Sequence, residues 1–457
     1  MHNSRDRESK SIVVPEEVSA LSDNLSSIDI YRLAEIWSSL EEFEKESYLE
    51  KLPRDQLSAL FLELDTFDQK QLLKSVPQAT RKKWIKILEP DDLADLLREV
   101  GDEEREESLS YLGDNARKEV KALLAYAEDE AGGLMNPRFI RIRPELLVEE
   151  ALSYMRAQMR LQSDPIYYGY VLNREQVLLG IVSLRQLFLS NPTTKVEDIM
   201  TKDLVVIPFD MDQEEVSKIF YRYEYVALPV VNEDKKMMGI ITSHDVQEVT
   251  EEETTEDFHK IGGMSSTDKP YFQLTWVEMF KKRVGWLLIL FLGETLTAYA
   301  LGIYEKHLER AMVLAFFIPL ITSSGGNSGS QISTLIIRAM ALGEVRLRDW
   351  WRVLGREFLS GLSLGLILGL VGFIKVYAFA SQAESSTTHN LGSIGFVVAI
   401  SLLGVVTWGT VIGSMLPFIL RRVGFDPASA STPFVATIVD VAGVMIYFTV
   451  AALVLGF

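Results

Sequence analysis

The chain has 457 residues, of which 47% are hydrophobic, and it contains no cysteine. This length predicts about three domains of roughly 150 residues each, and the lack of cysteine excludes disulfide frameworks and thiolate metal sites. The chain holds 64 acidic and 46 basic residues, but only 9 and 11 of these lie from Arg283 onward. The first 282 residues therefore carry a net charge near −20. That charge disfavours a nucleic-acid partner and fits either simple solubility or a surface that attracts cations.

Residues 1–130 are predicted to form a helical, acidic N-terminal domain. The first 17 residues lack the apolar core of a secretory signal, so we expect the N-terminus in the cytosol. From residue 18, apolar residues recur at three- and four-residue spacing, which indicates helices. RDQLSALFLEL at 54–64 aligns with PDDLADLLREV at 90–100, and this period of 36 residues is typical of a two-helix repeat. We therefore expect a small helical solenoid.

Residues 131–248 contain a second internal repeat. MNPRFIRIRPELLVEEAL (135–152) matches MTKDLVVIPFDMDQEEVS (200–217), and YGYVLNREQVLLGIVSLRQL (168–187) matches YVALPVVNEDKKMMGIITSHDV (225–246). Each copy is predicted to form strand, helix, strand, turn, strand and helix. Two tandem copies of this form resemble a pair of CBS domains, an α/β unit whose last strand typically reads like GIVSL and GIITS. Residues 249–280 then begin with the charged stretch VTEEETTEDFHKIGG. This stretch is either a solvated linker or a connecting helix with a role of its own.

Residues 281–457 are predicted to form a polytopic α-helical membrane domain with five spans. The apolar stretches lie near 284–304, 311–338, 357–380, 394–419 and 432–456. Each is long enough to cross the apolar core of a bilayer, roughly 30 Å. Lysines and arginines precede the first stretch, separate the second from the third and follow the fourth, whereas the loop at 381–393 has none. The positive-inside rule then places the N-terminus in the cytosol and the C-terminus outside, in the cytoplasmic membrane.

The second apolar stretch carries an unusual number of polar residues, in PLITSSGGNSGSQISTLIIR at 319–338. On a helix, one face would present Ser324, Asn327 or Ser328, Gln331 and Thr334. Gly325 and Gly329 form a GxxxG pair, which favours close helix packing. Packing alone does not explain the amides, and hydroxyl and amide oxygens suit a hydrated hard cation. The stripe is therefore a candidate lining for an ion pathway.

Two carboxylates lie within the predicted spans. Such charges are costly in a membrane and usually face a cavity or a partner. Asp440 is the only ionisable side chain of the fifth stretch and lies near its middle. It could make a helix-to-helix hydrogen bond, but with no cationic side chain in view a cation in transit is the better explanation. Glu294 in the first stretch is either a pathway residue or a protonated packing residue, and Lys375 in the third is expected to be structural.

Over nearly its whole length the sequence resembles the MgtE family of magnesium transporters. The resemblance is carried, besides the CBS pair, by PDDLAD (90–95), YAEDEAGGLMNP (126–137), TEDFHKIGG (255–263), FFIPLITSSGGNSGSQISTLIIRAMALGEV (316–345) and DPASASTPFVATIVDVAG (426–443). It implies a homodimer with a pore on the two-fold axis. It also implies that the N-terminal domain and the CBS pair sense cytosolic Mg²⁺, and that a plug helix joins them to five spans.

By this resemblance Asp440 is the pore carboxylate that binds Mg²⁺, with the backbone carbonyl of Ala436 nearby. Thr432 stands at the inner pore mouth, where some members have an asparagine. The residues that match the regulatory Mg²⁺ ligands are Asp91, Asp95, Asp212, Glu214, Glu224, Asp245, Glu253, Glu256, Asp257 and Asp426. These acids would repel one another in a compact, closed state, which bound Mg²⁺ would stabilise by differential affinity. Each could instead be a plain surface acid.

CBS domains that bind adenine nucleotides often carry Ser/Thr-x-x-Asp. The second copy has this pattern from Thr242 to Asp245, but the first has Gln186 in place of the aspartate. ATP therefore stays an open cofactor, disfavoured in the first copy. No P-loop is present, so we expect neither an enzyme nor an ATP-driven pump. The alternatives to a gated Mg²⁺ importer are a membrane-anchored metal sensor, and a transporter of another divalent cation or of an anion.

Overall fold

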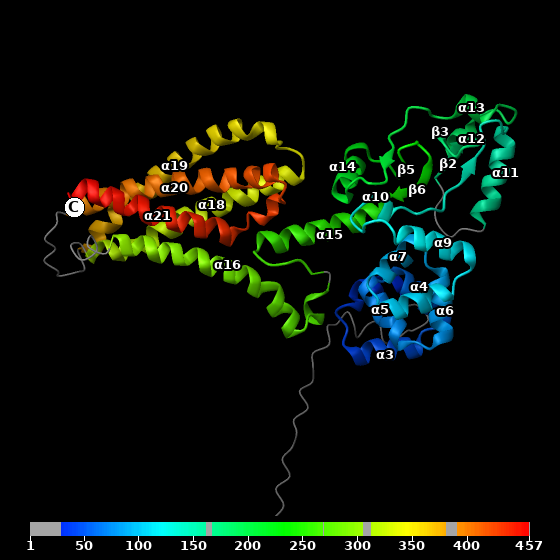
Figure 1. Cartoon of the computed structure of the whole chain (residues 1–457), viewed down its shortest axis with the longest axis horizontal. Helices are drawn as coiled ribbons and strands as arrows, with labels where there is room; N and C mark the ends of the chain where they lie inside the picture. Colours follow the sequence, from blue (N-terminus) through cyan, green and yellow to red (C-terminus); the bar gives the residue numbers. More distant parts are fainter. Residues whose placement is uncertain (1–28, 161–166, 268, 305–311, 381–390, 457) are drawn as a thin grey trace, which may run out of the picture. The chain divides into compact units, whose positions relative to one another are not determined.

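The computed structural model describes residues 29–160, 167–267, 269–304, 312–380 and 391–456 (Figure 1). It divides into two compact units, Met1–Val249 and Thr250–Phe457. The start of the chain, expected in the cytosol, lies outside the described residues, and so does most of the loop without lysine or arginine, residues 381–390.

The first unit begins with short helices that recur at a fixed spacing. They are α2 (Ile30–Trp37), α3 (Glu42–Lys51), α4 (Arg54–Glu63), α5 (Thr66–Ser75), α6 (Gln78–Ile87), α7 (Pro90–Arg98), α8 (Asp102–Ser110) and α9 (Asp114–Leu123). From α3 onward each helix begins 12 residues after the previous one. The period of 36 residues seen in the sequence therefore covers three helices, and the prediction of a two-helix repeat unit is wrong.

The same tertiary contact recurs along these helices. A side chain donates a hydrogen bond to the carbonyl oxygen eight residues before it, from Gln69 to Phe61, Arg81 to Leu73, Arg105 to Leu97 and Arg117 to Leu109, over 2.8–3.0 Å. Helices this short are marginal in isolation, so their packing supplies the stability. Phe61 and Trp84 stack at 4.5 Å between ring centroids in a core that is mostly leucine.

The CBS pair follows α10 (Ala131–Leu134) and forms two sheets with the same topology. The first copy consists of β1 (Arg141–Ile142), α11 (Val148–Met159), β2 (Tyr168–Leu172), β3 (Leu178–Ser183) and α12 (Leu184–Leu189). The second consists of α13 (Val196–Ile199), β4 (Ile207–Pro208), α14 (Gln213–Tyr223), β5 (Ala227–Val231) and β6 (Met237–Thr242). In both sheets the first strand is parallel and the third antiparallel to the central strand. The predicted repeat is confirmed.

The two copies are joined by reciprocal bridges. Asn136, which precedes the first copy, pairs with Ile240 of the second, and Thr201, which precedes the second copy, pairs with Ile181 of the first. Gly180 and Gly239 permit these approaches, since a Cβ at either would lie 2.7–2.8 Å from the crossing backbone. Each copy therefore completes the other.

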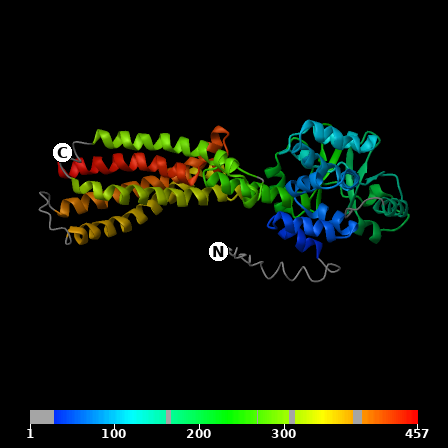
Figure 2. The same ribbon diagram turned by 90° about the horizontal axis from the view of Figure 1, so that it is seen from below.

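Helix α15 (Ser243–Ile261) is continuous with the end of the CBS pair, and the second unit consists of the rest of α15 and a helical bundle. The bundle helices are α16 (Trp276–Ile303), α18 (Ile318–Ala341), α19 (Trp350–Ala380), α20 (Leu391–Val423) and α21 (Thr432–Leu455), with 3₁₀ turns η2 (Tyr271–Gln273), η3 (Met312–Phe317), η4 (Leu347–Asp349) and η5 (Pro427–Ser429). Helix α18 packs against α20 and α21, α19 against α20, and α16 against α21, and the helices run side by side (Figure 2).

Within the described residues, four helical segments are long and apolar enough to cross a membrane: Trp276–Ile303, Leu347–Ala378, Leu391–Val423 and Thr432–Leu455. They correspond to four of the five predicted stretches. The remaining stretch forms α18, whose 24 residues would measure about 36 Å at about 1.5 Å per residue. Its serines, threonines and amides make it too polar to be counted with the others, so five spans are not confirmed on apolarity alone.

Candidate ion pathway

One face of α18 is fitted to α20 by glycine. A Cβ at Gly409 would lie 2.4 Å from the carbonyl oxygen of Gly325, and a Cβ at Gly413 would lie 2.1 Å from that of Gly329. Side chains at these positions would meet backbone, which cannot move aside cheaply. Ser328 and Thr410 share a hydrogen bond of 2.7 Å across the same contact. The glycine pair predicted to pack closely does so, and Ser328 belongs to this packing face.

A second face of α18, with α21, forms a cleft of about 610 Å³. Its lining residues share small size or an uncharged polar group, apart from one carboxylate: Pro319, Thr322, Ser323, Gly326, Asn327, Ser330, Gln331, Thr432, Pro433, Ala436 and Asp440. Gly326 keeps the cleft wide beside the carboxylate, because a Cβ there would lie 3.4 Å from the Cβ of Ala436 and 3.9 Å from an oxygen of Asp440. No lysine or arginine lines the cleft.

Asp440 is the charged group of this cleft. It lies at mid-length on α21 and is half-buried. Within the described part of the chain it makes no hydrogen bond or ion pair, and its electrostatic partner is another carboxylate, Glu294 of α16. Close packing of Gly293 against Thr437 brings α16 and α21 together at this level. An unpaired carboxylate beside neutral oxygens is an arrangement that a cation would complete.

The predicted stripe on α18 divides between environments. Asn327 and Gln331 line the cleft, together with Thr432 and Ala436 of α21. Ser324 lies outside the lining and donates to the carbonyl of Leu320 at 2.6 Å, and Thr334 donates to that of Ser330 at 3.1 Å. Glu294 is exposed on α16 and does not line the cleft.

Sequence reasoning missed Ser323 and Ser330, which lie on the cleft. Ser330 also donates to the carbonyl of Thr432 at 3.1 Å and so joins α18 to the start of α21. The steps from Ser323 to Asn327 and Ser330 are four and three, so the same helical spacing would have found this face if it had started one residue earlier.

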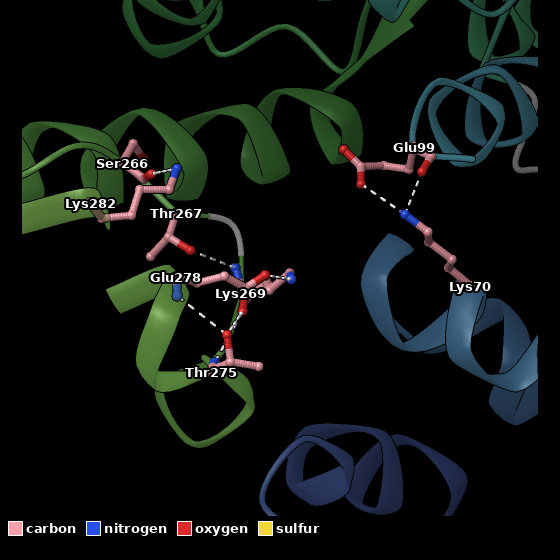
Figure 3. Close-up of polar contacts among 8 residues, drawn as sticks. All are labelled: Lys70, Glu99, Ser266, Thr267, Lys269, Thr275, Glu278 and Lys282. Carbon is pink, nitrogen blue, oxygen red and sulfur yellow. Dashed lines mark hydrogen bonds and ion pairs between the residues drawn. The ribbon is translucent and has the colours of Figure 1, made fainter. Parts of the chain in front are cut away.

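The segment after α15 lies against one end of the bundle. Lys260 pairs with Asp426 at 2.6 Å and with Glu256 at 2.7 Å. Ser265 donates its backbone N–H to the carbonyl of Lys282 at 3.1 Å. Figure 3 shows Lys282 returning a hydrogen bond to the carbonyl of Ser266, and it shows the contacts of Lys269 and Thr275 with Glu278 at the start of α16. The charged stretch is therefore an ordered helix with contacts to the bundle.

The predicted regulatory acids of the first unit have several environments. Asp95 pairs with Arg98 and Glu214 with Lys218, the latter at 3.0 Å, while Asp212 caps α14 and Glu224 ends it in the left-handed region. Similar lysine–carboxylate pairs occur elsewhere, as between Lys70 and Glu99 at 3.2 Å (Figure 3). These contacts are those of ordinary surface acids.

Asp91 and Asp245 differ from the others. Asp91 is buried, and one of its carboxylate oxygens has no hydrogen-bond partner among the described residues. Burial raises the pKa of Asp91 well above its usual range, and Asp92, Asp245 and Glu89 raise it further. Burial also raises the pKa of Asp245, against the hydrogen bonds that it accepts from Thr242. These acids face one another with no cation between them.

Across the described ranges, no three histidine or acidic side chains come close enough together to hold a metal ion. Glu253 and Asp257 lie on α15, where each has a contact of its own. Any metal site built from the predicted regulatory acids therefore needs further ligands, such as backbone carbonyls, water or groups from a second chain.

Comparison with known proteins agrees with this architecture. Family models match residues 28–129 as the MgtE intracellular N domain, 131–190 and 196–252 as CBS domains, and 318–450 as the divalent cation transporter MgtE. Magnesium transporter MgtE of Thermus thermophilus is 39% identical over 443 residues, which cover 95% of each chain. The chain belongs to the MgtE family of magnesium transporters.

Other members of the MgtE family match along the chain as well. Magnesium transporter MgtE of Bacillus subtilis is 30% identical over 421 residues, 92% of this chain and 91% of that one. Among solved structures, the cytosolic domain of the Mg²⁺ channel MgtE in complex with ATP is 34% identical, covers 51% of this chain and 94% of that one, and has a TM-score of 0.47. The chain is thus a membrane transporter for Mg²⁺, of a family that is not one of enzymes.

Proposed function

We propose that this MgtE protein is a gated Mg²⁺ channel that imports Mg²⁺ across the cytoplasmic membrane and is closed by cytosolic Mg²⁺. The observation that carries the proposal is the Asp440 carboxylate, which has no hydrogen-bond or ion-pair partner among the described residues and lies on a cleft lined by neutral oxygens. Mg²⁺ loses its water reluctantly and is usually held by one or two carboxylates with much of its water shell retained. A single acid with hydroxyls and amides suits such an ion.

The chemistry of the lining supports a cation over an anion. Ser323, Asn327 and Gln331 offer oxygens to the waters of the ion, and the backbone of Ala436 lies one turn before Asp440. An anion pathway would need lysine or arginine on the cleft, where none is found. Asp440 and Ala436 are therefore the proposed pore ligands, with Thr432 at the inner mouth.

The proposed assembly is a homodimer with five spans in each chain. The cleft is open on one side of α18 and α21, and a second copy related by a two-fold axis would close it and bring two Asp440 carboxylates to one ion. Helix α18 counts as the fifth span because it is long enough and its polar side chains face the cleft or hydrogen-bond to neighbouring groups. Five spans place the N-terminus in the cytosol and the C-terminus outside.

The proposed gate rests on the acids outside the cleft. Asp91 and Asp245 are buried next to each other without a cation, a costly arrangement that bound Mg²⁺ would relieve. Asp95, Asp212, Glu214, Glu224, Glu253, Glu256, Asp257 and Asp426 are the other proposed regulatory ligands. Because Mg²⁺ binds such a compact state better than a separated one, it would shift the population toward the closed channel.

ATP remains a second regulatory ligand to be tested. The solved cytosolic domain noted above is described as a complex with ATP. In this chain the Gln186 side chain is engaged by Ser183 and Thr201, and Asp245 by Thr242, so neither is free to hold a ribose without rearrangement. We place ATP, if it acts here, at the second copy.

The proposal is tested by Mg²⁺ flux into liposomes that hold the purified protein, with Mg²⁺ on the cytosolic face set low and then high. We expect flux in wild type, suppression by high Mg²⁺, and no flux in Asp440→Ala. Flux without suppression would keep the pore and remove the gate. No flux in folded wild type would favour a membrane-anchored sensor, and flux of Co²⁺ but not Mg²⁺ would change the substrate.

A further inference from the structure

The end of α15 is fitted closely to the bundle. Ile261 packs against Ala428 and Ala430 beside η5. Gly263 has a φ of +73°, and a Cβ there would lie 2.6 Å from the ring of Trp286. That ring donates a hydrogen bond of 3.2 Å to Ser431, the residue that caps α21. The segment 260–263 therefore contacts the end of the bundle at which Thr432 and Pro433 line the cleft.

Lys260 joins this segment to the bundle by charge. Its ammonium lies 2.6 Å from a carboxylate oxygen of Asp426 and 2.7 Å from one of Glu256. The other oxygen of Asp426 accepts the backbone N–H of Ala428 at 2.8 Å, which fixes the carboxylate in η5. Glu256 is one helical turn before Lys260, the favourable order for an i,i+4 pair. One ammonium thus bridges a carboxylate on α15 and a carboxylate on the bundle.

The bridge is only partly open to solvent, since the side chain of Lys260 is 27% exposed and that of Asp426 37%. Burial works against the charged form of Lys260, but its hydrogen bonds to Asp426 and Glu256 outweigh this, and the pKa of Lys260 lies above its usual value. The amine is therefore positively charged at every physiological pH.

We propose that Lys260 is a tethered cation that occupies the position between Glu256 and Asp426 and holds the end of α15 against the inner end of the cleft before Mg²⁺ binds there. Both acids are among the proposed regulatory ligands, so this inference rests on the proposed function and adds to it a residue of opposite charge. Lys260 and the two acids together carry a charge of −1. That charge still attracts Mg²⁺, but less strongly than two unpaired carboxylates would.

The proposal makes the closed contact less dependent on Mg²⁺ than the acids alone would make it. Without the ammonium, Glu256 and Asp426 would face each other unpaired and repel, and only a divalent cation could join them. With it, the segment is held at low Mg²⁺, and Mg²⁺ then strengthens an existing contact.

The test is hydrogen–deuterium exchange of the backbone amides of residues 262–265 in the full-length protein in lipid nanodiscs, with EDTA and with millimolar Mg²⁺. These amides donate to Phe258, Lys260, His259 and Lys282. In Lys260→Met, which keeps the length of the side chain, we expect exchange about three- to tenfold faster in EDTA, the effect of losing two partly exposed ion pairs. Mg²⁺ should return it to the wild-type rate. Lys269→Met, which removes the lysine paired with Glu278, is the matched control.

A second variant guards against local misfolding. Asp426→Asn keeps an acceptor for the N–H of Ala428 and removes only the charge, and we expect it to speed exchange in EDTA as Lys260→Met does. The double variant should exchange no faster than either single one if the two residues act through one contact. Wild-type rates in Lys260→Met with EDTA, or additive effects in the double variant, would overturn the proposal. Mg²⁺-independent exchange in wild type would instead count against the proposed gate.

Discussion

The cleft in the bundle and the acids around Asp91 place unpaired carboxylates in opposite surroundings. Asp440 is half-buried, stands on an open cleft and has neutral oxygens around it. Asp91 is buried and has three other acids, Asp92, Asp245 and Glu89, acting on it. By contrast Asp68, equally buried in the first unit, is paired with Lys45 at 3.2 Å. One acid with neutral oxygens binds a cation that can leave again, whereas several acids together bind one only in a state that the cation itself stabilises.

The strongest way to break this comparison is to remove the charge of Asp440. Asp440→Asn keeps the shape of the cleft and loses the one charged contact with the ion. A charge-assisted contact contributes about 1.5–3 kcal/mol, so we expect Mg²⁺ flux in liposomes to fall at least about tenfold. Size-exclusion chromatography should show the wild-type oligomer. Undiminished flux would remove Asp440 from the pathway.

The width of the cleft can be tested at Gly326. Alanine fits there, since its Cβ would lie 3.4 Å from Ala436, but it places a methyl group beside the carboxylate of Asp440. We expect Gly326→Ala to fold normally and to lower flux by about two- to tenfold, because an ion with its water shell needs the room. Gly355→Ala on α19, where a Cβ meets nothing within 4 Å, is the control. Equal flux in the two variants would mean that the cleft is wider than the hydrated ion requires.

For the acid cluster the sharpest test is the pH dependence of stability. The pKa of Asp91 is raised above its usual 3.8 in the folded state, so the folded protein holds this proton more tightly than the unfolded chain does. The free energy of unfolding without Mg²⁺ should therefore fall as pH rises from 3.8 through the raised pKa. Asp91→Asn should remove this loss and stabilise the Mg²⁺-free protein at pH 7 by about 1 kcal/mol.

Thermal unfolding with EDTA and with Mg²⁺ measures this effect. Asp91→Asn should also gain less stability from Mg²⁺ than wild type does. The exposed acid Asp102 of the same domain supplies the control, Asp102→Asn. A lower melting temperature of Asp91→Asn in EDTA would show that the Asp91 carboxylate stabilises the fold by itself.

The smallest effect is expected at Glu294. Its carboxylate acts on Asp440 but does not line the cleft. Glu294→Gln should change flux by less than about twofold, since a charge that the ion does not touch adds only a screened attraction. A loss as large as that of Asp440→Asn would place Glu294 in the ion pathway, on a surface that a second chain completes.

The sequence was sufficient for the domain order, the CBS repeat and the packing of Gly325 and Gly329, because each depends on a local pattern that recurs. It was less able to choose the cleft face of α18. Serines occur on several sides of this helix, at 323, 324, 328 and 330, and only the glycines of α20 decide which side packs and which stays open. The bridge of Lys260 to Asp426 joins residues 166 apart in sequence, and no spacing predicts it.

The 12-residue spacing of helices α3 to α9 has a consequence for how this domain could change in length. Each unit makes the same side-chain-to-carbonyl contact with the one before it, from Gln69, Arg81, Arg105 and Arg117. Deleting or duplicating one whole unit before α7 would join equivalent surfaces and keep the orientation of Asp91, while any other number of residues would break the succession. The domain is in this sense a modular ruler, graduated in steps of one helix.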